Sequence, residues 1–77
     1  MYLDQIKDIV SEQFDVERDT LSADTDFLSD LDADSLDVVE LSMSIEEAFH
    51  LSEISEEDLR SIRTLGDLAA YVERALG

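Results

Sequence analysis

The order of apolar and polar residues predicts a helix at the start of the chain and a long polar loop after it. Apolar residues recur every three or four positions in the first stretch, which favours a helix from about Leu3 to Phe14. The next segment, Asp15 to Asp34, is rich in Asp, Ser and Thr. Loops of this length are uncommon in small domains and are often functional. A few apolar side chains should attach this loop to the core: Val16, Leu21, Phe27, Leu28 and Leu31.

A second helix is expected from Asp34 or Ser35 to about Phe49, and it carries apolar residues on two sides. Asp34 followed three residues later by Asp37 is typical of a helix start. At about 100° per residue, one side forms a core face. Its members are Val38, Leu41, Ile45, Ala48 and Phe49. The opposite side holds an apolar strip of Leu36, Val39 and Met43. The long loop could cover this strip, but the periodicity favours an exposed site for a partner protein.

Two further signals predict the remaining helices. Ser55, followed by three acidic residues, favours a short helix that ends near Ile62. Thr64 and Asp67 open a last helix. Its apolar residues are Leu65, Leu68, Ala69, Val72 and Leu76. The prediction is an all-α four-helix bundle, one domain over residues 1–77, with a short third helix and a long loop between helices one and two.

The charge of the chain indicates which kinds of partner it can bind. Five Lys and Arg stand against 21 Asp and Glu in 77 residues, which gives a net charge of −16. From Asp19 to Leu59 the sequence contains no Lys or Arg. This acidity argues against nucleic acid as a partner, because phosphates would be repelled. It favours a docking surface for basic partners.

Few residues offer chemistry of their own. The absence of Cys excludes a disulfide scaffold, a thiol nucleophile and a thiolate metal site. The single histidine, His50, is expected to be a capping or surface group, and no nucleophile with a base is indicated, so we expect no enzyme. No apolar run approaches the about 20 residues that span a membrane, and no leader opens the chain. A cytoplasmic protein without a membrane span is therefore expected.

Three aspartates at alternate positions resemble the start of an EF-hand calcium loop. They are Asp30, Asp32 and Asp34. The rest of the motif fails, because Ser35 replaces the glycine at its sixth position and Leu41 replaces the glutamate at its twelfth. We therefore expect no metal site, apart from weak binding of Mg²⁺ or Ca²⁺ to the clustered acids.

Ser35 has a distinctive place, at the end of the long loop and the start of the second helix. One interpretation is a plain N-cap or first-turn serine. The other is a modification site, because free N–H groups and the helix dipole favour an attached phosphate. Asp34 and Asp37 would repel a phosphate, so the pattern of residues leaves both interpretations open.

The residues around Ser35 resemble the prosthetic-group motif of acyl carrier proteins. The run DADSLDVVEL, from Asp32 to Leu41, holds the D-S-L core of that motif, followed by V-E-L. The similarity reaches back to the run FLSDL at 27–31. It reaches forward through Met43, Glu46, Glu47 and Phe49 to Ile62, Thr64 and Leu65. The order and spacing are similar to those of the free-standing carriers of type II fatty acid synthesis.

The resemblance implies that Ser35 carries 4′-phosphopantetheine, transferred from coenzyme A by a Mg²⁺-dependent holo-carrier synthase, which is a phosphopantetheinyl transferase. The serine oxygen would attack the β-phosphate, and the distal thiol would hold growing acyl chains as thioesters. The carrier would be a monomer that catalyses nothing itself. Ketosynthases, reductases, dehydratases and acyltransferases of fatty acid synthesis would act on the chain. A polyketide or other specialist carrier is the alternative, and an acidic calcium-binding or interaction module is a remote one.

The resemblance also implies a partner surface and a binding region for the acyl chain. The family's recognition positions match Asp34, Leu36, Asp37, Val39, Glu40, Met43, Glu46 and Glu47. This set contains the whole apolar strip, which the periodicity indicates independently. The acyl chain would be lined by Val38, Leu41, Ile45, Ile54, Leu59, Ile62 and Ala69.

Three positions depart from the family pattern. Asp32 stands where the family usually has Gly, one additional residue follows Phe49, and Ser55 replaces the family's Pro. The first concerns the turn before Ser35, because Gly gives a backbone freedom that Asp lacks. The other two concern the loop between the second and third helices.

Overall fold

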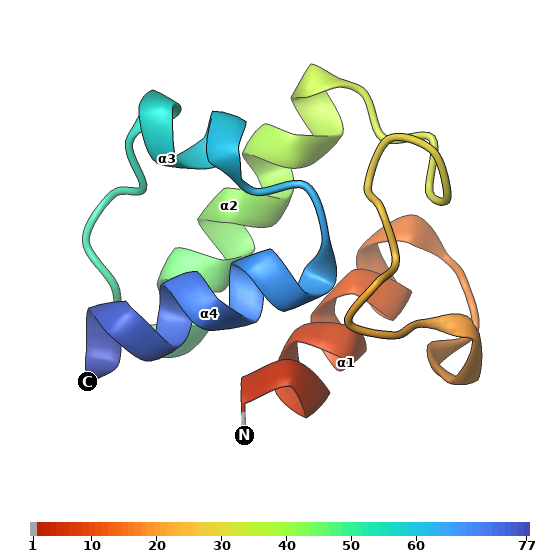
Figure 1. The fold of residues 1–77 in the computed structure, drawn as a ribbon, viewed down its shortest axis with the longest axis horizontal. Coiled ribbons are helices and arrows are strands. Elements are labelled where there is room, and N and C mark those ends of the chain that lie inside the picture. Colours follow the sequence, from red (N-terminus) through yellow and green to blue (C-terminus); the bar gives the residue numbers. More distant parts are fainter. Residues whose placement is uncertain (1) are drawn as a thin grey trace.

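The computed structural model describes residues 2–77, and its regular elements are all helical (Figure 1). The four predicted helices are confirmed as α1 (Tyr2–Phe14), α2 (Ser35–Phe49), α3 (Glu56–Ser61) and α4 (Leu65–Leu76). The long loop also contains a short 3₁₀ helix, η1 (Arg18–Thr20), that the pattern did not predict. No helix within the described range is both long and apolar enough to cross a membrane.

The last two helices begin where the sequence predicts, because polar side chains bind their free N–H groups. The Thr64 hydroxyl accepts a hydrogen bond from the Asp67 N–H at 3.1 Å, and an Asp67 carboxylate oxygen accepts one from the Thr64 N–H at 3.2 Å. The Ser55 hydroxyl accepts a hydrogen bond from the Asp58 N–H at 3.2 Å. Such capping, reciprocal in α4 and one-way in α3, stabilises a helix start by about 1 kcal/mol. Ser55 thus starts α3 without the proline that is usual in the family.

The core lies where α1, α2 and α4 meet, and the loop contributes to it. α1 packs against both α2 and α4. Burial of apolar surface at this junction drives folding, at about 25 cal/mol per Å². The most completely buried side chains come from all three helices: Ile6, Val10, Ile45, Leu65 and Val72.

The long loop is attached to the segment that leads into α4. The Phe27 N–H donates to the Arg63 carbonyl at 2.9 Å, and the Leu65 N–H donates to the Thr25 carbonyl at 3.1 Å. The Phe27 side chain is buried in the core, as predicted. Leu21 is also buried, and Val16 and Leu31 pack against the core. Contacts far apart in the sequence therefore hold the loop that leads to α2.

The predicted burial of Leu28 is wrong, since 64% of this residue is exposed. A carboxylate oxygen of Asp26 accepts hydrogen bonds from the N–H groups of Leu28 and Ser29, at 2.8 and 3.1 Å. The hydrogen bond from the Ser29 N–H, and after it the one from the Leu28 N–H, lowers the pKa of the Asp26 carboxyl. They form a tight turn that directs Leu28 away from the core.

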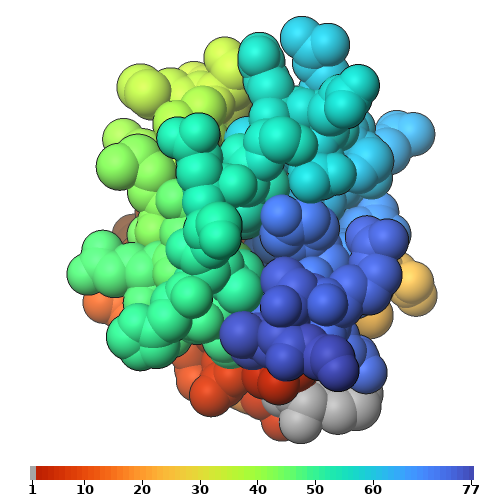
Figure 2. Space-filling model, turned by 90° about the vertical axis from the view of Figure 1, so that its left-hand side faces the viewer, coloured from red at the N-terminus to blue at the C-terminus, as the bar shows by residue number. Residues whose placement is uncertain are grey.

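The segment between α2 and α3 lies between α2 and α4 on one face of the molecule (Figure 2). α2 ends at Phe49, and the next residue, His50, is exposed and adopts a left-handed conformation with φ of 55°. Its N–H donates to the Glu46 carbonyl, so its predicted place as a capping or surface residue is confirmed. Further along, Ile54 enters the core with 4% exposure.

We predict that the two sides of α2 differ sharply in their effect on stability. Replacing the fully buried Ile45 with Ala should lower the free energy of unfolding by about 2–5 kcal/mol, because it leaves a cavity. Met43→Ala, on the exposed side, should change it by about 0.5 kcal/mol or less. Urea titrations followed by circular dichroism measure both values. Equal losses would contradict the assignment of the two sides.

Candidate functional site

The start of α2 is fixed by an exchange of hydrogen bonds between Asp34 and Asp37. An Asp34 carboxylate oxygen accepts from the Asp37 N–H at 2.9 Å, and an Asp37 carboxylate oxygen accepts from the Asp34 N–H at 3.2 Å. The Val38 N–H then donates to the Asp34 carbonyl at 3.1 Å. The helix dipole favours both carboxylates at this end. Asp34 is therefore the N-cap, and Ser35 is the first residue of the helix.

The hydroxyl of Ser35 is exposed and has no part in this arrangement. It forms no hydrogen bond with another side chain or backbone group in the part of the chain that the structure describes. Ser35 is thus a first-turn residue, the N-cap position belongs to Asp34, and the role of Ser35 as a modification site stays a prediction. The hydroxyl is therefore free to react without a loss of helix stability.

The turn before Ser35 uses a conformation that suits glycine. Asp32 has φ of 52°, in the left-handed region, where Asp is tolerated better than most residues with a side chain. Ala33 follows with its side chain buried and its N–H donating to the Phe27 carbonyl at 2.9 Å. Asp32 thus adopts the left-handed turn at the position of the family's glycine, and Ala33 anchors that turn to the core.

The apolar strip of α2 is exposed, as the periodicity predicts. Leu36 is 65% exposed, Val39 45% and Met43 61%. The loop does not cover these side chains, so the alternative of a buried strip is excluded. An apolar strip of this kind, bordered by charged residues, is typical of a site that binds another protein.

The prediction that Ala48 belongs to the core face of α2 is wrong. Ala48 is exposed, and Ser42, at 6% exposure, is buried in the core instead. The Ser42 hydroxyl donates to the Val39 carbonyl at 2.7 Å, which satisfies this polar group without water. Ser42 therefore belongs to the core side of α2, and Ala48 lies on the side of the helix that faces α1.

The three glutamates predicted for the partner surface have different surroundings. Glu40 and Glu47 are exposed beside the apolar strip. Glu46 is half-buried at the opposite edge of the strip, next to Val39, and one of its carboxylate oxygens accepts a hydrogen bond from the Ile54 N–H at 2.8 Å. This contact holds the segment between α2 and α3 against α2. The sequence pattern alone gave no sign of it.

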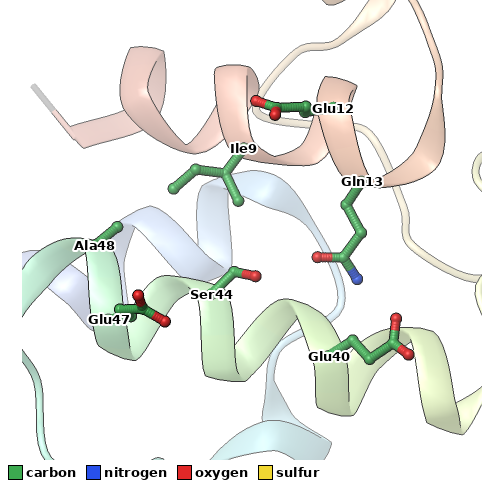
Figure 3. Close-up of a pocket in the computed structure, with 7 residues that line it drawn as sticks. All are labelled: Ile9, Glu12, Gln13, Glu40, Ser44, Glu47 and Ala48. Carbon is green, nitrogen blue, oxygen red and sulfur yellow. The ribbon is translucent and has the colours of Figure 1, made fainter.

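A groove between α1 and α2 lies next to these residues, and the sequence did not predict it. Its lining residues are Ile9, Glu12, Gln13, Glu40, Ser44, Glu47 and Ala48 (Figure 3). The Gln13 side-chain amide donates to the Asp37 carbonyl at 2.9 Å, which joins α1 to the first turn of α2.

The residues predicted to line an acyl chain come together on the other side of α2. Leu41, Ile45 and Ile54 are buried in the core, and the remaining four pack against it. None of the six residues of α3 is fully buried. α3 is thus a lightly packed cover over this part of the core.

Two of the clustered aspartates, Asp30 and Asp34, bind backbone N–H groups of this chain. Across residues 2–77, no three His, Cys, Asp or Glu side chains are placed to hold a metal ion together. An Asp30 carboxylate oxygen accepts a hydrogen bond from the Asp26 N–H at 2.8 Å, and Asp34 caps α2. These carboxylates therefore stabilise local backbone turns.

Comparison with known proteins gives one consistent family. The family model for the phosphopantetheine attachment site matches residues 4–72. The acyl carrier protein of Bdellovibrio bacteriovorus is 47% identical over 70 residues, which cover 91% of this chain and 88% of the relative. That of Wolinella succinogenes is 46% identical over 70 residues and covers 91% of both chains. The solved structure of the acyl carrier protein from Enterococcus faecalis is similar with a TM-score of 0.79 and 34% identity, over 95% of this chain and 91% of that one.

We predict that the turn at residue 32 accepts glycine but rejects a β-branched residue. Asp32→Gly should leave the free energy of unfolding within about 1 kcal/mol of the original chain, because relief of the left-handed conformation offsets the entropy of glycine. Asp32→Val should lower it by about 1–2 kcal/mol. The two variants change the charge equally, so a difference between their urea midpoints reports the backbone. Identical midpoints would argue against a left-handed residue 32.

Proposed function

The chain belongs to the acyl carrier protein family, which carries a covalently attached 4′-phosphopantetheine, and we propose that Ser35 is the attachment residue. The observation that carries this assignment is the free, exposed hydroxyl of Ser35 at the first position of α2. Asp34 performs the capping that a serine at a helix start often performs. The D-S-L run around Ser35 agrees with the assignment.

The surroundings of Ser35 fit a phosphodiester. The free N–H groups in the first turn of α2 favour one negative charge at this end. The carboxylates of Asp34 and Asp37 oppose it, but both are already held by backbone N–H groups. A single phosphodiester charge on an exposed side chain is therefore compatible with the site.

Attachment forms a phosphoester bond to Ser35 and breaks the phosphoanhydride bond of coenzyme A. The Ser35 oxygen attacks the β-phosphorus of coenzyme A, and the new oxygen–phosphorus bond replaces the bond to the adenosine bisphosphate, which leaves. The hydroxyl proton passes to a base that the Mg²⁺-dependent transferase supplies. Once attached, the group provides a terminal thiol that holds acyl chains as thioesters. Ser35 is consequently a substrate residue of the transferase, and the chain itself is a carrier without catalysis.

The surface that partners recognise is proposed to be the exposed side of α2. Leu36, Val39 and Met43 supply apolar contact, and Glu40 and Glu47 supply charge for a basic patch on the partner. Asp34, Asp37 and Glu46 belong to the same predicted set. Their carboxylates already bind N–H groups of this chain, so we expect them to contribute less to docking.

The partners that we propose are the holo-carrier synthase and the ketosynthases, reductases, dehydratases and acyltransferases of fatty acid synthesis. The run D-S-L-D with V-E-L supports the fatty acid pathway over a polyketide pathway.

We further propose that residues 1–77 act as one carrier domain and as a monomer. The cytoplasmic location stays a prediction.

Ser35→Ala should fold as the original chain does and lose the prosthetic group. Incubation with coenzyme A, Mg²⁺ and a broad-specificity phosphopantetheinyl transferase should add the mass of one phosphopantetheine to the original chain and nothing to the variant. Intact mass spectrometry measures both, and circular dichroism confirms the fold. A variant that still gains this mass would refute Ser35 as the attachment residue.

Charge reversal beside the apolar strip should weaken docking to the transferase. Glu40→Lys or Glu47→Lys should raise the KM for the carrier by about three- to tenfold at low salt, because each replaces an attractive charge with a repulsive one. The effect should shrink as ionic strength rises. Glu73→Lys, on α4, is the control with the same change in charge. If all three variants have the same KM, no local electrostatic interface exists on α2.

A further inference from the structure

We propose that the groove between α1 and α2 receives an arginine side chain of the partner enzyme, so that the docking surface includes α1 as well as α2. This inference rests on the proposed function, because it concerns the same partners. It goes further by assigning α1 residues, Glu12 above all, to recognition.

The groove has an apolar floor and polar walls. Figure 3 shows Ile9 of α1 and Ala48 of α2 facing each other, with the Ser44 hydroxyl between the two helices. Gln13 points from α1 toward α2, and its amide nitrogen donates to the Asp37 carbonyl at 2.9 Å. The amide oxygen of Gln13 is not used in this bond, so it can accept a hydrogen bond from a ligand.

The charges around the groove are uncompensated. Glu12, Glu40 and Glu47 line it, and no Lys or Arg does. The ion pairs within residues 2–77 use Arg18 and Arg60, whose partners lie elsewhere on α1 and on α3. A cation that enters the groove would therefore be flanked by carboxylates on both helices, and no basic side chain lines the groove to compete with it.

An arginine matches this combination of surfaces. Its aliphatic stem can lie on Ile9 and Ala48 while its head group stays near the carboxylates. The planar guanidinium offers five N–H donors, and carboxylate, amide and hydroxyl oxygens are the acceptors present. A second copy of this chain is a poorer occupant, because each copy has a net charge of −16 and the two would repel each other.

The groove is continuous with the surface proposed for docking. Glu40 and Glu47 line it and also stand beside Leu36 and Met43 on the exposed side of α2. An enzyme that covers the apolar strip would therefore reach the groove without a second binding event. This continuity favours the transferase and the synthesis enzymes as the source of the arginine.

The test compares Glu12→Lys with Glu73→Lys. Both glutamates are exposed in the last turn of their helices, α1 and α4, so the two variants match in charge and in helix position. Initial rates of loading by the phosphopantetheinyl transferase, with saturating coenzyme A at low salt, give the KM for each carrier. Glu12→Lys should raise it by about three- to tenfold, and Glu73→Lys by less than about twofold. An equal KM for both variants would overturn the proposal.

Ala48→Phe provides a second test that leaves the charge unchanged. The larger side chain should fill the groove and raise the KM, and this effect should persist at high salt, where that of Glu12→Lys fades. An unchanged KM for this variant would also overturn the proposal. Circular dichroism confirms that each variant is folded.

Two further outcomes separate the proposal from its premise. If the original chain gains no phosphopantetheine in prolonged loading, the proposed function fails, and this inference fails with it. If loading succeeds but sedimentation shows a dimer that Glu12→Lys dissociates, a second copy occupies the groove and the proposal is wrong. If the chain is loaded and stays a monomer, the comparison of KM values tests the role of the groove separately from the proposed function.

Discussion

The exchange of hydrogen bonds between Asp34 and Asp37 determines where α2 begins, and the remaining features of the molecule depend on this start. It makes Ser35 the first helical residue and leaves its hydroxyl free. It also sets which side chains face the core. A rotation of α2 by one residue, about 100°, would move Ile45 out of the core and bring charged groups toward it. The same two carboxylates thus position both Ser35, the proposed attachment residue, and the side of α2 proposed for docking.

Contacts between residues that are far apart in the sequence hold the segments before and after α2 in place. The loop before Ser35 is held by Phe27, whose N–H binds the segment before α4 and whose side chain enters the core. Beyond α2, the Glu46 carboxylate holds Ile54 and with it the segment that leads to α3. α3 itself has no fully buried residue. The strongly packed part of the chain therefore carries the serine and the exposed strip, and the weakly packed part covers the predicted acyl region.

The features that sequence analysis predicted correctly are those with local causes. Helix periodicity and capping pairs such as Thr64 and Asp67 depend on residues within one or two turns, so they predict the helices within about two residues. The exposure of Leu28, the left-handed turn at Asp32 and the inward role of Glu46 depend on contacts that only the folded chain makes. The groove between α1 and α2 is a product of how two helices pack, and neither helix indicates it alone.

The central claim is that α2 divides into a core side and a docking side, with the modified serine at its start. It is tested most directly by titrating the unlabelled transferase into the ¹⁵N-labelled Ser35→Ala chain and following backbone amide shifts. The account predicts changes at Leu36, Val39, Glu40, Met43 and Glu47, with the amides around Glu73 on α4 unaffected. Changes centred on α4, with α2 unaffected, would contradict it.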